Sequence, residues 1–69
     1  MTYKVLTPFV ALESDRPSFF FPAGATITLT GEIVDCEITH NDLVKVIYEG
    51  REVRAFRRDV ERRTTPVPG

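Results

Sequence analysis

The sequence LVKVIY-EG-REVRAF, residues 43–56, decides the fold of this chain. Apolar and polar residues alternate on both sides of Glu49-Gly50, a pattern that is typical of two strands with one buried face. Gly50 supplies the positive φ that a tight hairpin turn needs. The pattern therefore predicts an antiparallel β-hairpin in which residues 43–48 pair with residues 51–56.

A two-residue loop fixes which side chains of this hairpin share a face. Lys45 then lies directly opposite Arg54, and like charges in that position are mildly destabilising. They are tolerated either because Glu52 lies between them or because an anionic partner binds there. The predicted core face carries Val44, Val46, Val53 and Ala55, and the outward face carries Leu43, Lys45, Ile47, Glu52, Arg54 and Phe56.

Three large apolar side chains on the outward face indicate a contact surface. They are Leu43, Ile47 and Phe56. The alternative is that curvature of the sheet packs Leu43 or Phe56 beneath a loop at residues 13–18.

The remaining sequence also favours strands and turns over helix. The clearest further strand is at residues 26–30, where Ile27 and Leu29 alternate with threonines. Several short strands at close spacing predict an all-β fold, a small barrel of five to six antiparallel strands. The other predicted elements are strands at 3–9, 32–38 and 60–62, an aromatic run at 19–21, loops or turns at 13–18, 22–24 and 40–42, and one short 3-10 turn at 57–59.

Length and composition allow a single small domain. A chain of 69 residues, 42% of them hydrophobic, has material for one small core. We expect a barrel domain over residues 1–63 and a flexible tail over residues 64–69, because Pro66 and Pro68 cannot donate to a sheet. The sequence contains neither a signal-peptide pattern nor an apolar run of about 20 residues, so we expect a cytoplasmic protein without a membrane partner.

Three segments resemble those of Src-homology-3-like small β-barrels. Residues 21–29 are similar to the diverging turn and second strand of that fold, residues 44–56 to its central hairpin, and residues 56–61 to the helical turn before its last strand. The resemblance covers residues 3–63 and implies a barrel fold. The chain lacks the first-strand tyrosines and the tryptophan of the peptide-binding members, so binding of proline-rich peptides is not expected.

Cys36, His40 and Asp42 lie within seven residues, which invites a catalytic or metal-binding interpretation. Structural zinc needs four ligands, mostly Cys and His, and the chain has one of each. A lone cysteine is usually a small buried residue, and that is the interpretation we adopt for Cys36. Residues 53–56 align with a strand of plasmid-borne dihydrofolate reductases but depart from its motif at three positions. The sequence therefore predicts no enzyme, no metal and no cofactor.

Basic residues are concentrated in the second half of the chain. Residues 1–44 carry a net charge of −4 and residues 45–69 a net charge of +3, and seven of the nine basic residues are arginine. Arginine suits bidentate recognition of carboxylates and phosphates. Either the two halves neutralise each other in the fold, or the arginines bind an anionic partner.

These observations predict a non-catalytic interaction module. Its outward hairpin face would bind a protein partner or a second copy of the chain. The alternative is nucleic acid, bound by the arginines with Tyr48 and Phe56 as stacking residues, although the net charge of −1 is unusual for a dedicated nucleic-acid-binding domain. The candidate binding residues are Leu43, Lys45, Ile47, Arg54, Phe56, Arg57 and Arg58.

Overall fold

The computed structural model of this chain describes residues 1–13, 16–33 and 42–68. Within these ranges the chain forms seven strands and one short helix. All the strands belong to one antiparallel sheet with the order β3-β2-β6-β5-β4-β1-β7. The elements are β1 (Thr2–Val5), β2 (Phe9–Glu13), β3 (Arg16–Phe21), β4 (Thr26–Leu29), β5 (Leu43–Tyr48), β6 (Arg51–Phe56), α1 (Arg57–Arg63) and β7 (Thr64–Val67).

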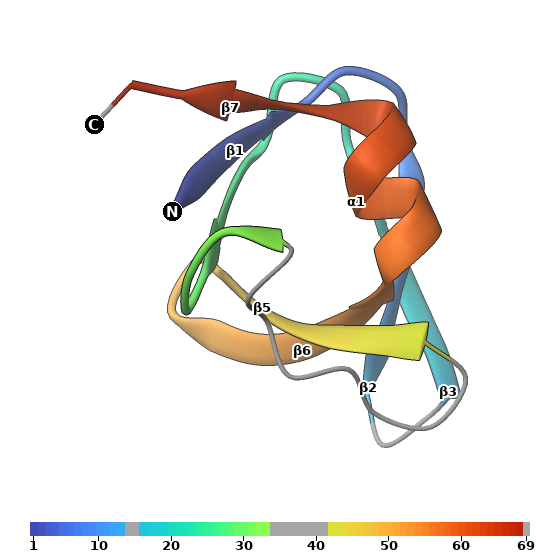
Figure 1. The fold of residues 1–69 in the computed structure, drawn as a ribbon. Helices are drawn as coiled ribbons and strands as arrows, with labels where there is room; N and C mark the ends of the chain where they lie inside the picture. The colour runs from blue at the N-terminus through green and yellow to red at the C-terminus, as the bar shows by residue number, and fades with distance from the viewer. Residues whose placement is uncertain (14–15, 34–41, 69) are drawn as a thin grey trace.

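The sheet is strongly curved but open. Figure 1 shows the strands following one another around the core, with α1 leading from β6 to β7. Strands β3 and β7 are the two edges, and no pairing joins them in the part of the chain that the structure describes. The predicted all-β class is confirmed, with seven strands instead of five or six. The predicted closure of the sheet into a barrel is not confirmed.

The hairpin formed by β5 and β6 has the predicted register. Val46 lies opposite Val53, Lys45 opposite Arg54, and Leu43 opposite Phe56. The two loop residues, Glu49 and Gly50, have φ angles of 50° and 77°. Two consecutive positive φ angles are the mark of a type I′ turn, whose twist matches that of the flanking strands.

The core lies on one face of this curved sheet. All four residues of the predicted core face of the hairpin are part of it, and an aromatic group extends it. Within that group the ring centroid of Phe21 lies 5.0 Å from that of Phe9 and 5.3 Å from that of Tyr48. The core residues are Tyr3, Val5, Phe9, Ala11, Phe21, Ile27, Leu29, Val44, Val46, Val53, Ala55 and Val60.

The N-terminal part contains more strand than the sequence predicted. The single strand expected over residues 3–9 is divided into β1 and β2, because the Leu6 N–H donates to the Arg63 carbonyl (2.7 Å) and Pro8 has no N–H. The loop expected over residues 13–18 is also shorter than predicted. Glu13 ends β2 directly opposite Arg16, the first residue of β3.

Helix α1 replaces both the 3-10 turn predicted at residues 57–59 and the strand predicted at residues 60–62. Its sequence places opposite charges four residues apart, a spacing that stabilises a helix. Arg57 Nε lies 2.8 Å from Glu61 Oε1, and Arg63 Nε lies 3.3 Å from Asp59 Oδ1. These pairs explain why the helix continues past its first turn.

The prediction of a flexible tail over residues 64–69 is wrong for Thr64–Val67. These residues form β7, which pairs with β1 from Val5 opposite Thr64 to Thr2 opposite Val67. Pro66 is tolerated because β7 is an edge strand, where the free side needs no donor. The Thr64 hydroxyl donates to the Val60 carbonyl and so connects β7 to the end of α1.

Two sequence predictions fall largely outside the described residues. They are the strand at 32–38 with Cys36 and the turn at 40–42 with His40. Glu32 and Ile33, the described part of that strand, do not adopt strand structure. Among the residues that are described, no cluster of possible metal ligands occurs, and no helix has the length and apolar character needed to cross a membrane.

Neighbouring residues of β5 provide a direct test of the two faces. Val46→Ala should lower the free energy of unfolding by about 1–3 kcal/mol, because Val46 is fully buried. Ile47→Ala should change it by only about 0.5 kcal/mol, because Ile47 faces outward. Urea unfolding of the two variants measures both values, and equal losses would contradict the assignment of the faces.

Candidate interaction surface on the outer face of the sheet

The predicted binding residues of the hairpin lie on the face of the sheet opposite the core, here called the outer face. Strand pairing extends this face from β5 and β6 to β2 and β3. Leu12 lies opposite Arg54, and Val10 lies opposite Phe20. In β2, β3, β5 and β6 the outer face comprises Val10, Leu12, Phe20, Leu43, Lys45, Ile47, Glu52, Arg54 and Phe56.

Leu43 does not belong to an exposed contact surface. Leu43 is only 3% exposed, although it lies on the outer face opposite Phe56. Leu12 is also buried, and both residues are separate from the core cluster. Leu43, one of the predicted binding residues, therefore offers no exposed side chain, because strand alternation defines the side on which a residue lies but not what packs over it.

The like charges on the outer face are compensated within the hairpin. Lys45 Nζ lies 3.8 Å from Glu52 Oε1, and both side chains are solvent-exposed. Arg54, opposite Lys45, is half-buried. An exposed pair of this kind contributes about 0–1 kcal/mol, which is enough to offset a mild repulsion. No external anion is needed to explain the Lys45–Arg54 juxtaposition.

Most of the remaining arginines are also engaged. Arg57 and Arg63 form the two ion pairs within α1. Arg51 pairs with Glu13, and its guanidinium lies 5.5 Å from the ring centroid of Phe19. The arginines of the second half are thus partly compensated by carboxylates from both halves of the chain.

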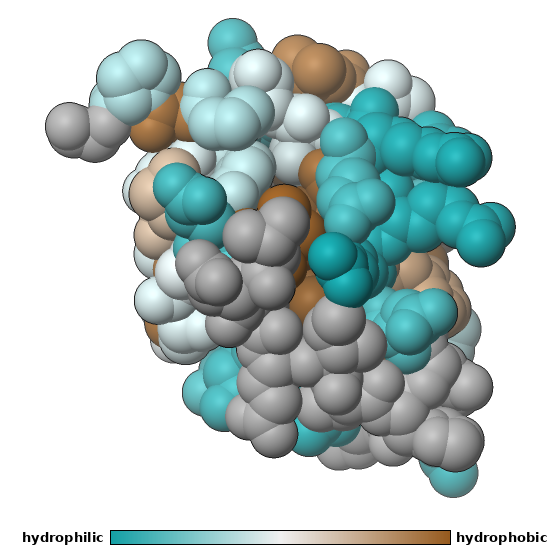
Figure 2. Space-filling model, viewed as in Figure 1, coloured by the Kyte–Doolittle hydropathy of each residue, from teal (hydrophilic) through white to brown (hydrophobic). Residues whose placement is uncertain are grey.

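Arg58 and Arg62 differ from these residues. They are exposed, lie four residues apart on α1, and have no ion pair with any other residue in the described ranges. They line one hollow of about 360 Å³ together with Asp42, Arg57 and Glu61. Figure 2 shows hydrophilic side chains gathered over the region of α1.

Tyr48 does not offer a free ring for base stacking. Its ring centroid lies 5.3 Å from that of Phe21, nearly at right angles, and 5.9 Å from that of Phe19. Partial burial, together with the charge of Glu49 and a hydrogen bond to it, raises the pKa of Tyr48 above its usual value of 10. The ring is part of the packed aromatic group.

Exposed apolar side chains remain at two ends of the outer face. Ile47 is 41% exposed at the turn end, whereas Phe56 at the other end is 37% exposed. Phe20 is 66% exposed on β3 opposite Val10. Leu12 and Arg54 form the pair that joins β2 to β6, and Val10 and Phe56 each lie two residues from it along their strands. Three residues therefore share the outer face of the consecutive strands β3, β2 and β6. They are Phe20, Val10 and Phe56, here called the apolar row.

The sequence contains a signal for Phe20 that its interpretation missed. Phe19, Phe20 and Phe21 are consecutive, and alternate residues of a strand point to opposite faces. If Phe21 enters the core, Phe20 must face outward. The aromatic run therefore predicts one exposed ring beside the hairpin.

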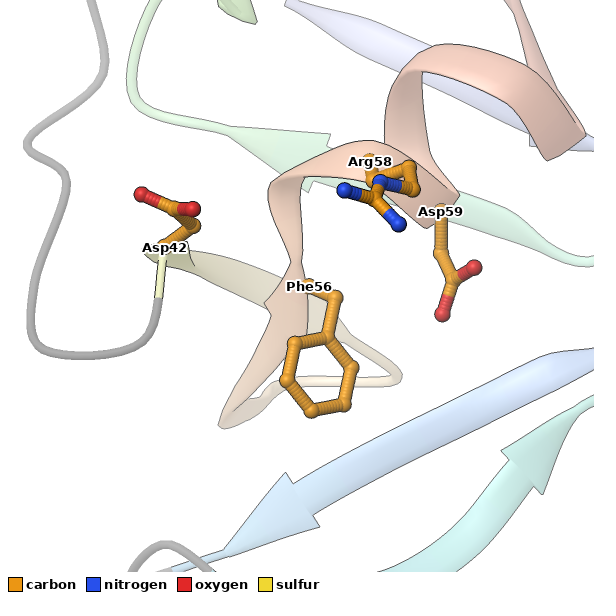
Figure 3. Close-up of a pocket in the computed structure, with 4 residues that line it drawn as sticks. All are labelled: Asp42, Phe56, Arg58 and Asp59. Atoms are coloured by element: carbon orange, nitrogen blue, oxygen red, sulfur yellow. The ribbon is translucent and has the colours of Figure 1, made fainter.

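Two hollows adjoin the apolar row and share Asp59 of α1. The first, of about 360 Å³, is lined by Asp42, Phe56, Arg58 and Asp59. Figure 3 shows the Phe56 ring at the end of β6 below the two charged residues of α1, with Asp42 on the other side. The second, of about 390 Å³, is lined by Pro8, Phe9, Val10, Phe20, Asp59 and Arg63.

This arrangement suits binding. Exposed rings on rigid strands, bordered by charges of both signs, can anchor an apolar side chain and orient it by ion pairing. Comparisons with protein-family models, with curated proteins and with solved structures found no match to this chain.

The two neighbouring phenylalanines of β3 test the position of the apolar row. Phe21→Ala should lower the free energy of unfolding by about 3–5 kcal/mol because Phe21 is fully buried. Phe20→Ala should lower it by less than about 1 kcal/mol because its ring is exposed. Urea unfolding followed by tyrosine fluorescence measures both. The opposite ranking would show that β3 presents its other face to the core.

Proposed function

We propose that this chain is a non-catalytic interaction module of the cytoplasm that binds a protein partner through the outer face of its 43–56 hairpin. We further propose that its curved sheet is a variant of the Src-homology-3-like barrel. The order of hairpin, short helix and final strand supports the barrel assignment, and the single cysteine suits a reducing compartment.

The observation that carries this proposal is the exposed apolar row with charged residues along one side. Exposed aromatic side chains near the centre of a surface, with a polar rim, are the usual anchors of protein interfaces. Phe56 and Phe20 provide the anchors, and Arg58 and Asp59 provide the rim. Ile47 extends the surface toward the turn. The proposed partner therefore presents an apolar side chain flanked by charged or polar groups.

Nucleic acid is the second candidate, and one observation favours it. Arg58 and Arg62 are the exposed arginines of α1 that lack an ion pair with another described residue. Two such residues on one side of a helix can contact successive phosphates. The packed ring of Tyr48 and the compensated charges of Arg57 and Arg63 favour the protein partner instead.

Surface variants distinguish the two candidates. The chain, immobilised through its C-terminus, would be used to retain a protein from an extract of the source cells. That protein would be purified, and its affinity for the chain would be measured by titration. Phe56→Ser and Ile47→Glu should each weaken its binding about tenfold or more, whereas Arg62→Ala should have little effect. Raising the salt concentration from about 50 to about 200 mM should hardly change the affinity, because apolar contacts are not screened.

A labelled single-stranded oligonucleotide of mixed sequence provides the comparison. Binding that falls steeply with salt and is lost in Arg58→Ala and Arg62→Ala, while Phe56→Ser retains it, would replace the protein-partner proposal with the nucleic-acid one. Circular dichroism of each variant confirms that the fold is intact.

A further inference from the structure

Strand β3 is an open edge of the sheet. It pairs with β2 on one side, and no other described strand lies on its free side. An edge strand presents backbone N–H and C=O groups that can pair with another strand. Proteins usually protect such edges with charges or prolines, and β3 has these only at its start, Arg16 and Pro17. Residues 18–21 have neither.

The opposite edge, β7, is protected. Pro66 lies within this strand, and Pro68 follows its last residue, Val67. Because β7 pairs with β1 on its inner side, Pro66 is accommodated on the free side. A further strand would find a donor missing there. Pairing of β3 with β7 of another copy, which would continue into a filament, is therefore disfavoured.

The unprotected part of β3 also carries the most exposed large apolar side chain of the described residues, Phe20 at 66%. The strand that presents it is held in place. Ser18 Oγ donates to Glu13 Oε1 (3.1 Å), and Phe19 packs between Arg51 and Tyr48. A strand that is already ordered loses little conformational entropy when it pairs.

We propose that two copies of this chain pair antiparallel through their β3 edges, with Phe20 beside the partner's Phe20. A two-fold axis at this position places Phe20 opposite Phe20, Phe19 opposite Phe21 and Ser18 opposite Pro22 of the second copy, so no like charges meet. The two Arg16 side chains then lie at opposite ends of the paired strands. Such an isologous contact closes at two copies, and the cross-strand aromatic pair stabilises it.

This pairing does not rest on the proposed function, because it uses the free backbone edge of β3 and shares only Phe20 with the proposed binding surface. Four to six paired residues with one aromatic pair form a small interface, below the roughly 1,200 Å² of stable complexes. We therefore expect a weak, reversible dimer, with a Kd on the order of 100 µM.

Analytical ultracentrifugation of the native chain from about 10 µM to about 1 mM tests the proposal. The mass should rise from one copy toward two over this range. Phe20→Lys and Phe20→Glu should each raise the Kd at least about tenfold, because like charges then meet at the two-fold axis. An equimolar mixture of these two variants should regain dimer at low salt, because opposite charges then meet.

The controls identify the surface that is used. Thr65→Lys, an exposed position on β7, should leave dimerisation unchanged. A native chain that stays monomeric, a mixture that sediments as its separate components, or dimerisation lost in Thr65→Lys would overturn the proposal. Dimerisation lost in Ile47→Glu and retained in Phe20→Lys would assign self-association to the outer face of the hairpin instead, and would overturn the β3 pairing while leaving the proposed function intact.

Discussion

The two-residue turn at Glu49-Gly50 is the constraint on which the rest of this structure depends. Its positive φ angles give a type I′ turn, and a two-residue loop allows only one register of the two strands. Every cross-strand pair from Tyr48–Arg51 to Leu43–Phe56 therefore follows from the turn. A shift of one residue would exchange the two faces of the hairpin. The turn thus determines that the valines enter the core and that Phe56 faces outward.

The ends of the chain complete the sheet and position the charged rim of the candidate surface. Strand β7 pairs with β1, and the Leu6 N–H donates to the Arg63 carbonyl at the end of α1. These contacts hold the helix between β6 and β7, and the buried Val60 fixes its orientation. As a result, Arg58 and Asp59 lie beside Phe56, so residues close in sequence form both the anchor and the rim.

Sequence reasoning recovered the features that depend on neighbouring residues and missed those that depend on topology. Alternation and one glycine were sufficient for the hairpin register and the four buried residues of its core face. The burial of Leu43 depends on what packs over the sheet, and the pairing of β7 depends on β1 having a free side; neither is encoded locally. The length of α1 and the outward position of Phe20 were encoded locally, in the i,i+4 charges and in three consecutive phenylalanines.

The central claim is that the hairpin register places Phe56 on the outer face, in one row with Val10 and Phe20. Nuclear Overhauser spectroscopy of the labelled chain tests this claim most directly. The account predicts contacts from the Val10 methyl groups to the rings of both Phe20 and Phe56, and none from the Phe56 ring to the methyl groups of Val46. A contact between Phe56 and Val46 would place Phe56 in the core and contradict the account.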